Sequence, residues 1–187
     1  MSKKVLITGA TGDTGRATVR EALALGLNVR AMVRKLDDRS TALEAQGAEI
    51  VIGDLHDINS LRDAMQGVES AYFVYPVAPG LIPATVNFAQ AAKETGVKYV
   101  LNLSQRSADR ESSSDSCRDT FIAEEVLNWS GVPVVHLRPT YFLEWLSYPW
   151  QLPYLQQGIL RMPAGKGRHS PIAADDQAGA IAALLKN

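Results

Sequence analysis

The chain has a single cysteine and almost no net charge. One thiol, Cys117, excludes an internal disulfide bond and fits a reducing compartment, so we expect a cytoplasmic location. The 19 basic and 20 acidic side chains give a formal net charge of -1, and no long block carries one sign. This balance argues against a nucleic-acid or anionic-membrane partner held by bulk electrostatics.

Long hydrophobic runs are missing as well. No apolar stretch approaches the roughly 20 residues that a membrane-spanning helix needs. The N-terminus enters a strand-like run at once, without the apolar segment and cleavage site of a signal peptide. A length of 187 residues with 46% hydrophobic composition is typical of one domain with a full core.

The N-terminal segment 5–15 joins an apolar strand to three glycines with the spacing Gly-x-x-Gly-x-x-Gly. In a dinucleotide-binding βαβ unit this loop binds the pyrophosphate. Gly9 allows a sharp turn, Gly12 a close approach of the phosphates with the tightest steric demand, and Gly15 close packing of the helix. The helix N-terminus adds free N–H groups and a positive dipole end.

Two threonines in the same loop, Thr11 and Thr14, add hydroxyl donors. Glycines mark turns in many proteins, so the alternative is a purely structural turn. The context favours a dinucleotide site, because a helical pattern follows the glycines and a second apolar run comes at 28–33.

Strand-like and helix-like segments alternate along the chain. The strand-like runs lie at 4–8, 28–33, 49–52, 70–74, 98–103 and 133–138. Helical patterns lie between them, at about 14–25, 38–46, 57–66, 81–95 and 117–130. The alternation predicts an α/β protein with a Rossmann-type doubly wound parallel sheet, helices on both faces and strand order 3-2-1-4-5-6.

Local signals sharpen this outline. The apolar runs at 5–7, 49–52 and 71–74 predict strands that are buried on both faces. Asp57 is placed to cap the N-terminus of one helix, and Gly96 to end another.

After Pro139 the alternation stops and aromatic side chains accumulate: Tyr141, Phe142, Trp145, Tyr148, Trp150 and Tyr154. We expect a helical excursion from the sheet. The aromatics either pack the domain and its neighbours or form a wall beside a nicotinamide ring. The chain is thus one NAD(P)-binding domain, 1–187, in which 140–187 begins a partial substrate-side region.

The end of the second strand bears on the choice of cofactor. NAD-binding proteins usually carry an acidic residue there, about 20 residues past the glycines, for the ribose hydroxyls. Here Arg34 and Lys35 follow the strand, and Asp37 comes too late. Arg34 suits the 2′-phosphate of NADP, assisted by Lys35 or Arg39. The sequence predicts NADP(H) over NAD(H), the alternative being a solvated basic loop.

Three further strand ends supply candidate cofactor contacts. Tyr75 and Ser104 follow the fourth and fifth strands, whose carboxyl ends line the crevice of a doubly wound sheet. Asp54, followed by Leu55, comes after the third strand, where its carboxylate can accept from the adenine amino group. The alternative for Asp54 is a turn into the helix that Asp57 caps.

Taken together, these stretches resemble the NmrA-like group of atypical short-chain dehydrogenases/reductases. The matching segments are 7–15, 30–34, 53–55, 123–127, 130–133 and 137–142. The glycine motif alone fits many short-chain dehydrogenases. The succession Glu-x-x-Leu-x-x-Ser-Gly-Val-Pro, followed by Leu-Arg-Pro, is much more specific.

The resemblance implies NAD(P)(H) binding, with either reductase activity, on quinones for example, or a redox-sensor role without turnover. It implies phosphate-binding roles for Gly9, Gly12, Asp13, Thr14 and Gly15, and the 2′-phosphate role for Arg34. It also implies that Thr140, Tyr141 and Phe142 lie near the nicotinamide.

Two features depart from that group. Short-chain dehydrogenases commonly use Tyr-x-x-x-Lys, in which lysine lowers the pKa of a tyrosine acid. No tyrosine here has a lysine four residues on, and the segment 99–165 holds no lysine at all. Arg118, near the position of a lysine in some members, is too weak an acid to replace it. The second departure is length, because most of the C-terminal substrate subdomain is expected to be absent from these 187 residues.

Other constellations are weak. His56, His136 and His169 are too widely spaced for a metal pattern, so we expect no metal site. The segment 165–169 has the composition of a phosphate loop but lacks its strand–loop–helix frame, which favours a solvated loop. The acidic pair 175–176 predicts the N-cap of a last helix.

Two functions therefore compete. The first is an NADPH-dependent oxidoreductase acting on a small molecule, with no catalytic residue assigned and with water as a possible proton source. The second is a non-catalytic NADP(H) sensor that reports to a protein partner. A sugar-nucleotide epimerase is disfavoured by the missing tyrosine–lysine pair.

Overall fold

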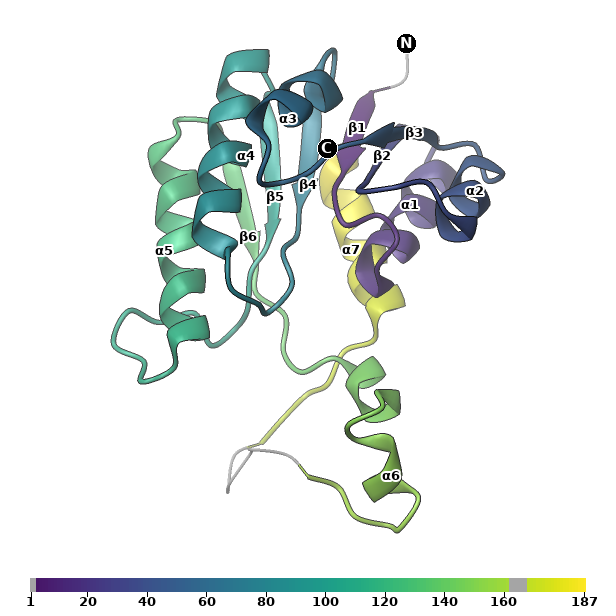
Figure 1. Ribbon diagram of the computed structural model, residues 1–187, viewed down its shortest axis with the longest axis vertical. Coiled ribbons are helices and arrows are strands. Elements are labelled where there is room, and N and C mark those ends of the chain that lie inside the picture. Colours follow the sequence, from purple (N-terminus) through teal and green to yellow (C-terminus); the bar gives the residue numbers. More distant parts are fainter. Residues whose placement is uncertain (1–2, 162–167) are drawn as a thin grey trace.

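The computed structural model describes residues 3–161 and 168–187. They form a parallel sheet with helices on both faces (Figure 1). The strands are β1 (Lys4–Ile7), β2 (Asn28–Val33), β3 (Glu49–Ile52), β4 (Ser70–Phe73), β5 (Tyr99–Leu103) and β6 (Val134–Leu137). Their order in the sheet, β3-β2-β1-β4-β5-β6, is the one predicted from the sequence.

The helices follow the predicted alternation. They are α1 (Asp13–Ala24), α2 (Asp38–Glu44), α3 (Ile58–Met65), α4 (Leu81–Thr95), α5 (Asp115–Trp129), α6 (Leu152–Leu155) and α7 (Ala174–Lys186), with a 3₁₀ helix, η1 (Leu143–Ser147). Asp57 accepts the Asn59 N–H at 3.0 Å and so caps α3. Gly96 ends α4 in the left-handed region, with φ 75°. Both boundaries agree with the sequence signals.

Two hydrophobic cores, one on each face, bury the middle of the sheet. Val5 and Ile7 of β1 pack on the face covered by α1 and α7, and Leu6 packs on the face covered by α3, α4 and α5. β1 and β4 are buried, as predicted. The same prediction is wrong for β3, where Ile52 is 57% exposed. β3 is an edge strand, so its side chains lack the cover that central strands receive on both faces.

Between β6 and α7 the chain leaves the body and forms a separate lobe (Figure 1). We call its described residues 143–161 the excursion. At its base the Ile172 N–H donates to Tyr141 O at 3.0 Å, and the Leu143 N–H donates to Ile172 O at 3.1 Å. The outgoing and returning passages of the chain are thus hydrogen-bonded to each other.

A side chain near the base of the excursion also forms a hydrogen bond with the first turn of α7. Glu144 Oε1 accepts the Ala174 N–H at 2.8 Å, although 30 residues separate the two. The N-cap residue of α7 is Ala173, so the prediction that the acidic pair 175–176 caps this helix is wrong. These two aspartates lie in the first turn, and a carboxylate from a distant segment satisfies one N–H instead.

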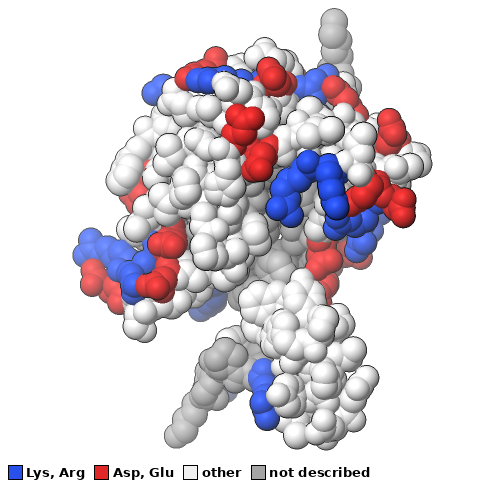
Figure 2. Space-filling view, viewed as in Figure 1, with Lys and Arg blue, Asp and Glu red and all other residues white. Residues whose placement is uncertain are grey.

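The surface shows no broad field of one sign on the face in view. Figure 2 shows acidic and basic side chains interspersed over the body, and few charges on the lobe of the excursion. Within the described part of the chain, no helix is long and apolar enough to cross a membrane.

Candidate functional site

The glycine loop between β1 and α1 is held by close contacts within itself. Gly9 turns the chain with φ 57°, and the Gly12 N–H donates to Gly9 O at 2.9 Å. A Cβ added at Gly15 would lie 2.1 Å from Gly9 O, whereas one at Gly12 would lie 3.3 Å from it. Within the protein the tightest position is therefore Gly15 rather than Gly12, because α1 rests directly on the turn.

The first turn of α1 presents free donors. Its N-cap, Gly12, has no side chain to cap the helix. Among residues 3–161 and 168–187, no acceptor contacts the backbone N–H groups of Asp13, Thr14 and Gly15. Three such donors at the positive end of a helix of 12 residues suit an anion such as a diphosphate. The residues present thus fit the dinucleotide that the motif predicts.

Two side chains of this turn, Asp13 and Thr14, accept hydrogen bonds from tyrosines. Tyr148 of the excursion donates to Asp13 Oδ2 at 2.7 Å. This bond to a carboxylate, together with burial, raises the pKa of Tyr148 to about 12. Beneath the loop, Tyr72 donates to Thr14 Oγ1 at 3.4 Å, and burial raises the pKa of Tyr72.

A cavity of about 840 Å³ opens beside this turn, at the carboxyl ends of β4, β5 and β6. It brings together six residues predicted for the site: Asp13, Thr14, Tyr75, Ser104, Thr140 and Tyr141. A large cavity at this edge is where doubly wound sheets bind their ligands.

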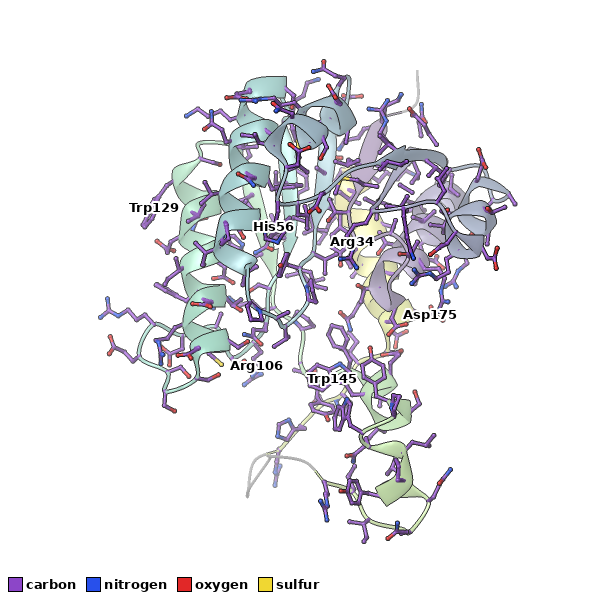
Figure 3. All side chains as sticks on the ribbon, viewed as in Figure 1. Arg34, His56, Arg106, Trp129, Trp145 and Asp175 are labelled. Carbon is purple, nitrogen blue, oxygen red and sulfur yellow. The ribbon has the colours of Figure 1, made fainter. Side chains whose placement is uncertain are left out.

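The far wall of the cavity is aromatic. Trp145 lies where the body meets the excursion (Figure 3), with its ring centroid 4.5 Å from that of Tyr141 and 6.5 Å from that of Trp150. Phe142 and Tyr148 line the same cavity. Five of the six aromatic residues of this run thus line the cavity, and Tyr154 does not.

The remaining predicted residues lie along the same edge of the sheet but outside this cavity. They are Gly9, Thr11, Gly12, Gly15, Arg34, Asp54 and Leu55. Arg34 is exposed at the end of β2 (Figure 3). Arg39, which was expected to help Arg34 bind the 2′-phosphate, forms an ion pair with Asp37, with 2.6 Å between Nη2 and Oδ2. Asp54 Oδ1 accepts the His56 N–H at 2.9 Å, so part of this carboxylate serves the local turn.

Tyr75 is held between two cavities. Its hydroxyl donates to Pro79 O at 3.1 Å and lies 2.9 Å from His56 Nε2. Because the tyrosine hydrogen goes to the carbonyl, His56 donates from Nε2 in this arrangement. A second cavity of about 390 Å³ lies behind Tyr75 and shares Ser104 and Gln105 with the first.

An ion pair between the buried Glu124 and the half-exposed Arg138 lies behind Ser104. Arg138, just after β6, donates from Nε to Glu124 Oε1 at 2.8 Å and from Nη2 to Glu124 Oε2. Ser104 Oγ donates to the same Oε1. Burial raises the pKa of Glu124, but the hydrogen bonds from Arg138 and Ser104 outweigh it, so the pKa lies below its ordinary value.

The NmrA-like family model matches residues 1–185. The chain belongs to the NmrA-like family. It is 29% identical over 183 residues to the NAD(P)H azoreductase of Xenophilus azovorans, covering 97% of this chain and 63% of that protein. It is 30% identical over 186 residues to quinone oxidoreductase 2 of Escherichia coli, with the same two coverages.

The chain is also similar in structure to a solved protein of the same kind as these relatives. An NADPH-dependent quinone oxidoreductase of Escherichia coli, in complex with NADPH, superimposes with a TM-score of 0.85 at 29% identity. The match covers 98% of this chain and 65% of the other. This NmrA-like chain therefore spans less than two thirds of the length of each of these relatives.

The NmrA-like motif has a physical basis that sequence reasoning did not find. Glu124 and Arg138 both lie in the segments that carry the resemblance, and the expected site residues include neither of them. The structure pairs Glu124 of α5 with Arg138, which lies 14 positions later and just after β6. The signal available was the pairing of an acidic residue before Leu-x-x-Ser-Gly with the arginine of Leu-Arg-Pro.

Two other sequence interpretations meet the structure only in part. Residues 162–167 lie outside the described part of the chain, so most of the segment 165–169 does too. Arg168 and His169 line the large cavity. Within residues 3–161 and 168–187 there is no group of three or more histidine, cysteine, aspartate or glutamate side chains able to hold a metal.

Proposed function

We propose that this protein is an NAD(P)H-dependent oxidoreductase that prefers NADP(H) and reduces planar aromatic compounds such as quinones. The observation that carries the proposal is the continuity between the free N–H groups of α1 and the aromatic-walled cavity, which share Asp13 and Thr14. The names of its relatives, an azoreductase and a quinone oxidoreductase, support the same class.

Each part of the site has a role in this proposal. The N–H groups of the first turn of α1 bind the diphosphate, and Gly9, Thr11, Gly12 and Gly15 shape the loop that admits it. Arg34 binds the 2′-phosphate. Asp54 and Leu55 lie on the adenine side, because they follow β3 on the same edge.

The nicotinamide side is formed by residues of the large cavity. Tyr75, Ser104, Thr140 and Tyr141 orient the ring there, and 140–187 supplies part of the substrate wall. When bound, the reduced nicotinamide supplies a hydride. The indole of Trp145 excludes water from one side of that space and gives an aromatic substrate a stacking surface.

Two tyrosines that line the cavity, Tyr141 and Tyr148, are weaker acids than an ordinary tyrosine. Burial raises the pKa of Tyr141, and the pKa of Tyr148 is about 12 because its phenol donates to Asp13. Lysine is absent from the described lining of the cavity. We therefore assign the proton of the reaction to solvent, which suits a quinone that accepts a hydride and then one proton from water.

A second candidate is a sensor that binds NADP(H) and reports to a protein partner without turnover. The raised pKa values of Tyr141 and Tyr148, and the absence of lysine from the described lining, favour it equally. Both candidates are proposed as cytoplasmic proteins, a location that the single cysteine supports.

Two measurements on this chain test the proposal. Titration calorimetry should show binding of NADPH, and Gly12→Val should abolish it. Steady oxidation of NADPH at 340 nm with 1,4-naphthoquinone should then distinguish reductase from sensor. Tight binding without turnover across a panel of quinones would favour the sensor, and absence of dinucleotide binding would overturn both candidates.

A further inference from the structure

Ser104 stands at the boundary between the ion pair and the ligand space. It follows β5, lines both cavities and is only 9% exposed. Its hydroxyl donates a hydrogen bond to Glu124, a residue that is only 2% exposed.

The state of Glu124 decides what the serine can do. Arg138 holds the carboxylate with two charge-assisted hydrogen bonds, so Glu124 is ionised near neutral pH. An ionised carboxylate only accepts hydrogen bonds. The hydrogen between Ser104 and Glu124 must therefore come from the serine.

A serine hydroxyl has one hydrogen and two lone pairs. The hydrogen of Ser104 is committed to Glu124. Within residues 3–161 and 168–187, no N–H or O–H group donates to Ser104 Oγ. Its lone pairs are left for whatever enters the cavities.

We infer that Ser104 is a fixed hydrogen-bond acceptor that recognises an N–H or O–H group on an aromatic ring bound in the cavity. The inference rests on the proposed function, which places such a ring beside Ser104. The donor belongs either to the carboxamide of the nicotinamide or to a hydroxyl or amine of the substrate. In both cases Ser104 gives no proton to the compound that is reduced.

This polarity has a measurable signature. An ordinary serine rotates its hydroxyl and accepts ligand donors or acceptors alike. A serine whose hydrogen is held by a buried carboxylate favours the donor, and a ligand without that donor loses one hydrogen bond. The loss corresponds to roughly a three- to tenfold change in affinity.

Two matched ligand pairs separate the two sources of the donor. The first pair is NADP⁺ and its 3-acetylpyridine analogue, which lacks the carboxamide N–H. The second is 2-naphthol and 2-methoxynaphthalene, titrated in the presence of saturating NADP⁺. The wild type should prefer the donor-bearing member of at least one pair by about three- to tenfold in calorimetry.

Three variants assign that preference to the serine. Ser104→Ala should remove the preference for the donor-bearing ligand. Ser104→Thr keeps the hydroxyl, so this variant should keep the preference. Glu124→Gln places an amide beside Oγ that can itself donate, so the serine hydrogen is released and the preference should fall. If the glutamine variant does not fold, the alanine and threonine variants still carry the test.

The contrary results are distinct from a failure of the proposed function. Equal affinities within both pairs for the wild type, or a preference that survives Ser104→Ala, would overturn the inference. Turnover of NADPH with 1,4-naphthoquinone under those circumstances would leave the oxidoreductase proposal standing. Absence of dinucleotide binding would remove the proposal itself.

Discussion

Tyr148 donates a hydrogen bond to Asp13 Oδ2 at 2.7 Å, across 135 positions of sequence. Asp13 is the first residue of α1, and Tyr148 directly follows η1. The bond therefore attaches the excursion to the loop whose N–H groups are proposed to bind the diphosphate. The other carboxylate oxygen of Asp13, Oδ1, lies 4.0 Å from Arg16 Nη2 on the same helix.

The Tyr148–Asp13 bond should be visible in the pH dependence of stability. Tyr148→Phe should lower the free energy of unfolding by about 1 kcal/mol at neutral pH, because one hydrogen bond is lost. The folded pKa of about 12 lies above the ordinary value of 10.0. The wild-type advantage is thus complete below pH 10 and disappears as the pH rises through 12.

Urea unfolding at pH 7, 9 and 11 measures this difference. The matched control is Tyr154→Phe, whose hydroxyl has no hydrogen bond within the described part of the chain and whose ring keeps its contact with Arg161. A Tyr148→Phe protein as stable as the control at pH 7 would contradict the prediction.

Gly15 should be the least replaceable glycine of the loop for folding. The added methyl of Gly15→Ala would lie 2.1 Å from Gly9 O, so α1 must move from the turn. We expect a loss of about 3 kcal/mol, the upper end of overpacking costs. Gly12→Ala is the control, with an expected loss of about 1 kcal/mol or less, because its methyl would lie at 3.3 Å. Equal melting temperatures of the two variants would refute this ranking.

Gly12 should matter most for the ligand. Gly12 adopts φ -83° and ψ 175°, an extended conformation open to any residue, so Gly12→Val should fold. Its branched side chain should nevertheless prevent the approach of the diphosphate and abolish NADPH binding. Calorimetry provides the measurement, with circular dichroism as the check on folding. Unchanged affinity in a folded variant would mean that the diphosphate binds elsewhere.

Arg34 should determine the preference for NADP(H). A guanidinium–phosphate contact contributes ~1.5–3 kcal/mol, or roughly ten- to a hundredfold in affinity. Arg34→Ala should erase this preference and leave NADH binding nearly unchanged. Arg39→Ala is the matched control, since that guanidinium is already paired with Asp37. Equal wild-type affinities for NADPH and NADH would disprove the assignment.

Tyr141 should act through its ring rather than its hydroxyl. Tyr141→Phe should keep most of any reductase activity, because the edge-to-face ring contact with Trp145 survives. Removal of a general acid would cost about 10²–10⁴-fold. Single-turnover hydride transfer at saturating cofactor distinguishes the two. A loss of that size would identify Tyr141 as the proton donor after all.

Most of the fold could be predicted because its signals are local. The apolar run of β1, the glycine turn and the cap at Asp57 each depend on neighbours in sequence, and the right-handed crossover rule then orders the strands. The start of α5 at Asp115, two positions before the expected 117, shows the ordinary uncertainty of a helix boundary.

The features that were missed depend on contacts between distant segments. Composition made β3 look buried on both faces, but its position at the sheet edge exposes Ile52. The cap of α7 comes from Glu144, which no local pattern reveals. In the candidate site, the strand ends were predictable from topology, whereas the orientation of Ser104 toward Glu124 depends on side-chain packing.

The paired base of the excursion has an evolutionary consequence. The segments that lead into and out of the excursion are hydrogen-bonded to each other at Tyr141, Leu143 and Ile172. The lobe is therefore an insertion between β6 and α7 whose two ends lie together. Its far end can gain, lose or exchange residues without altering the register of the sheet. In the proposed oxidoreductase, such a change would alter the compounds that fit beside the cavity and leave the glycine loop as it is.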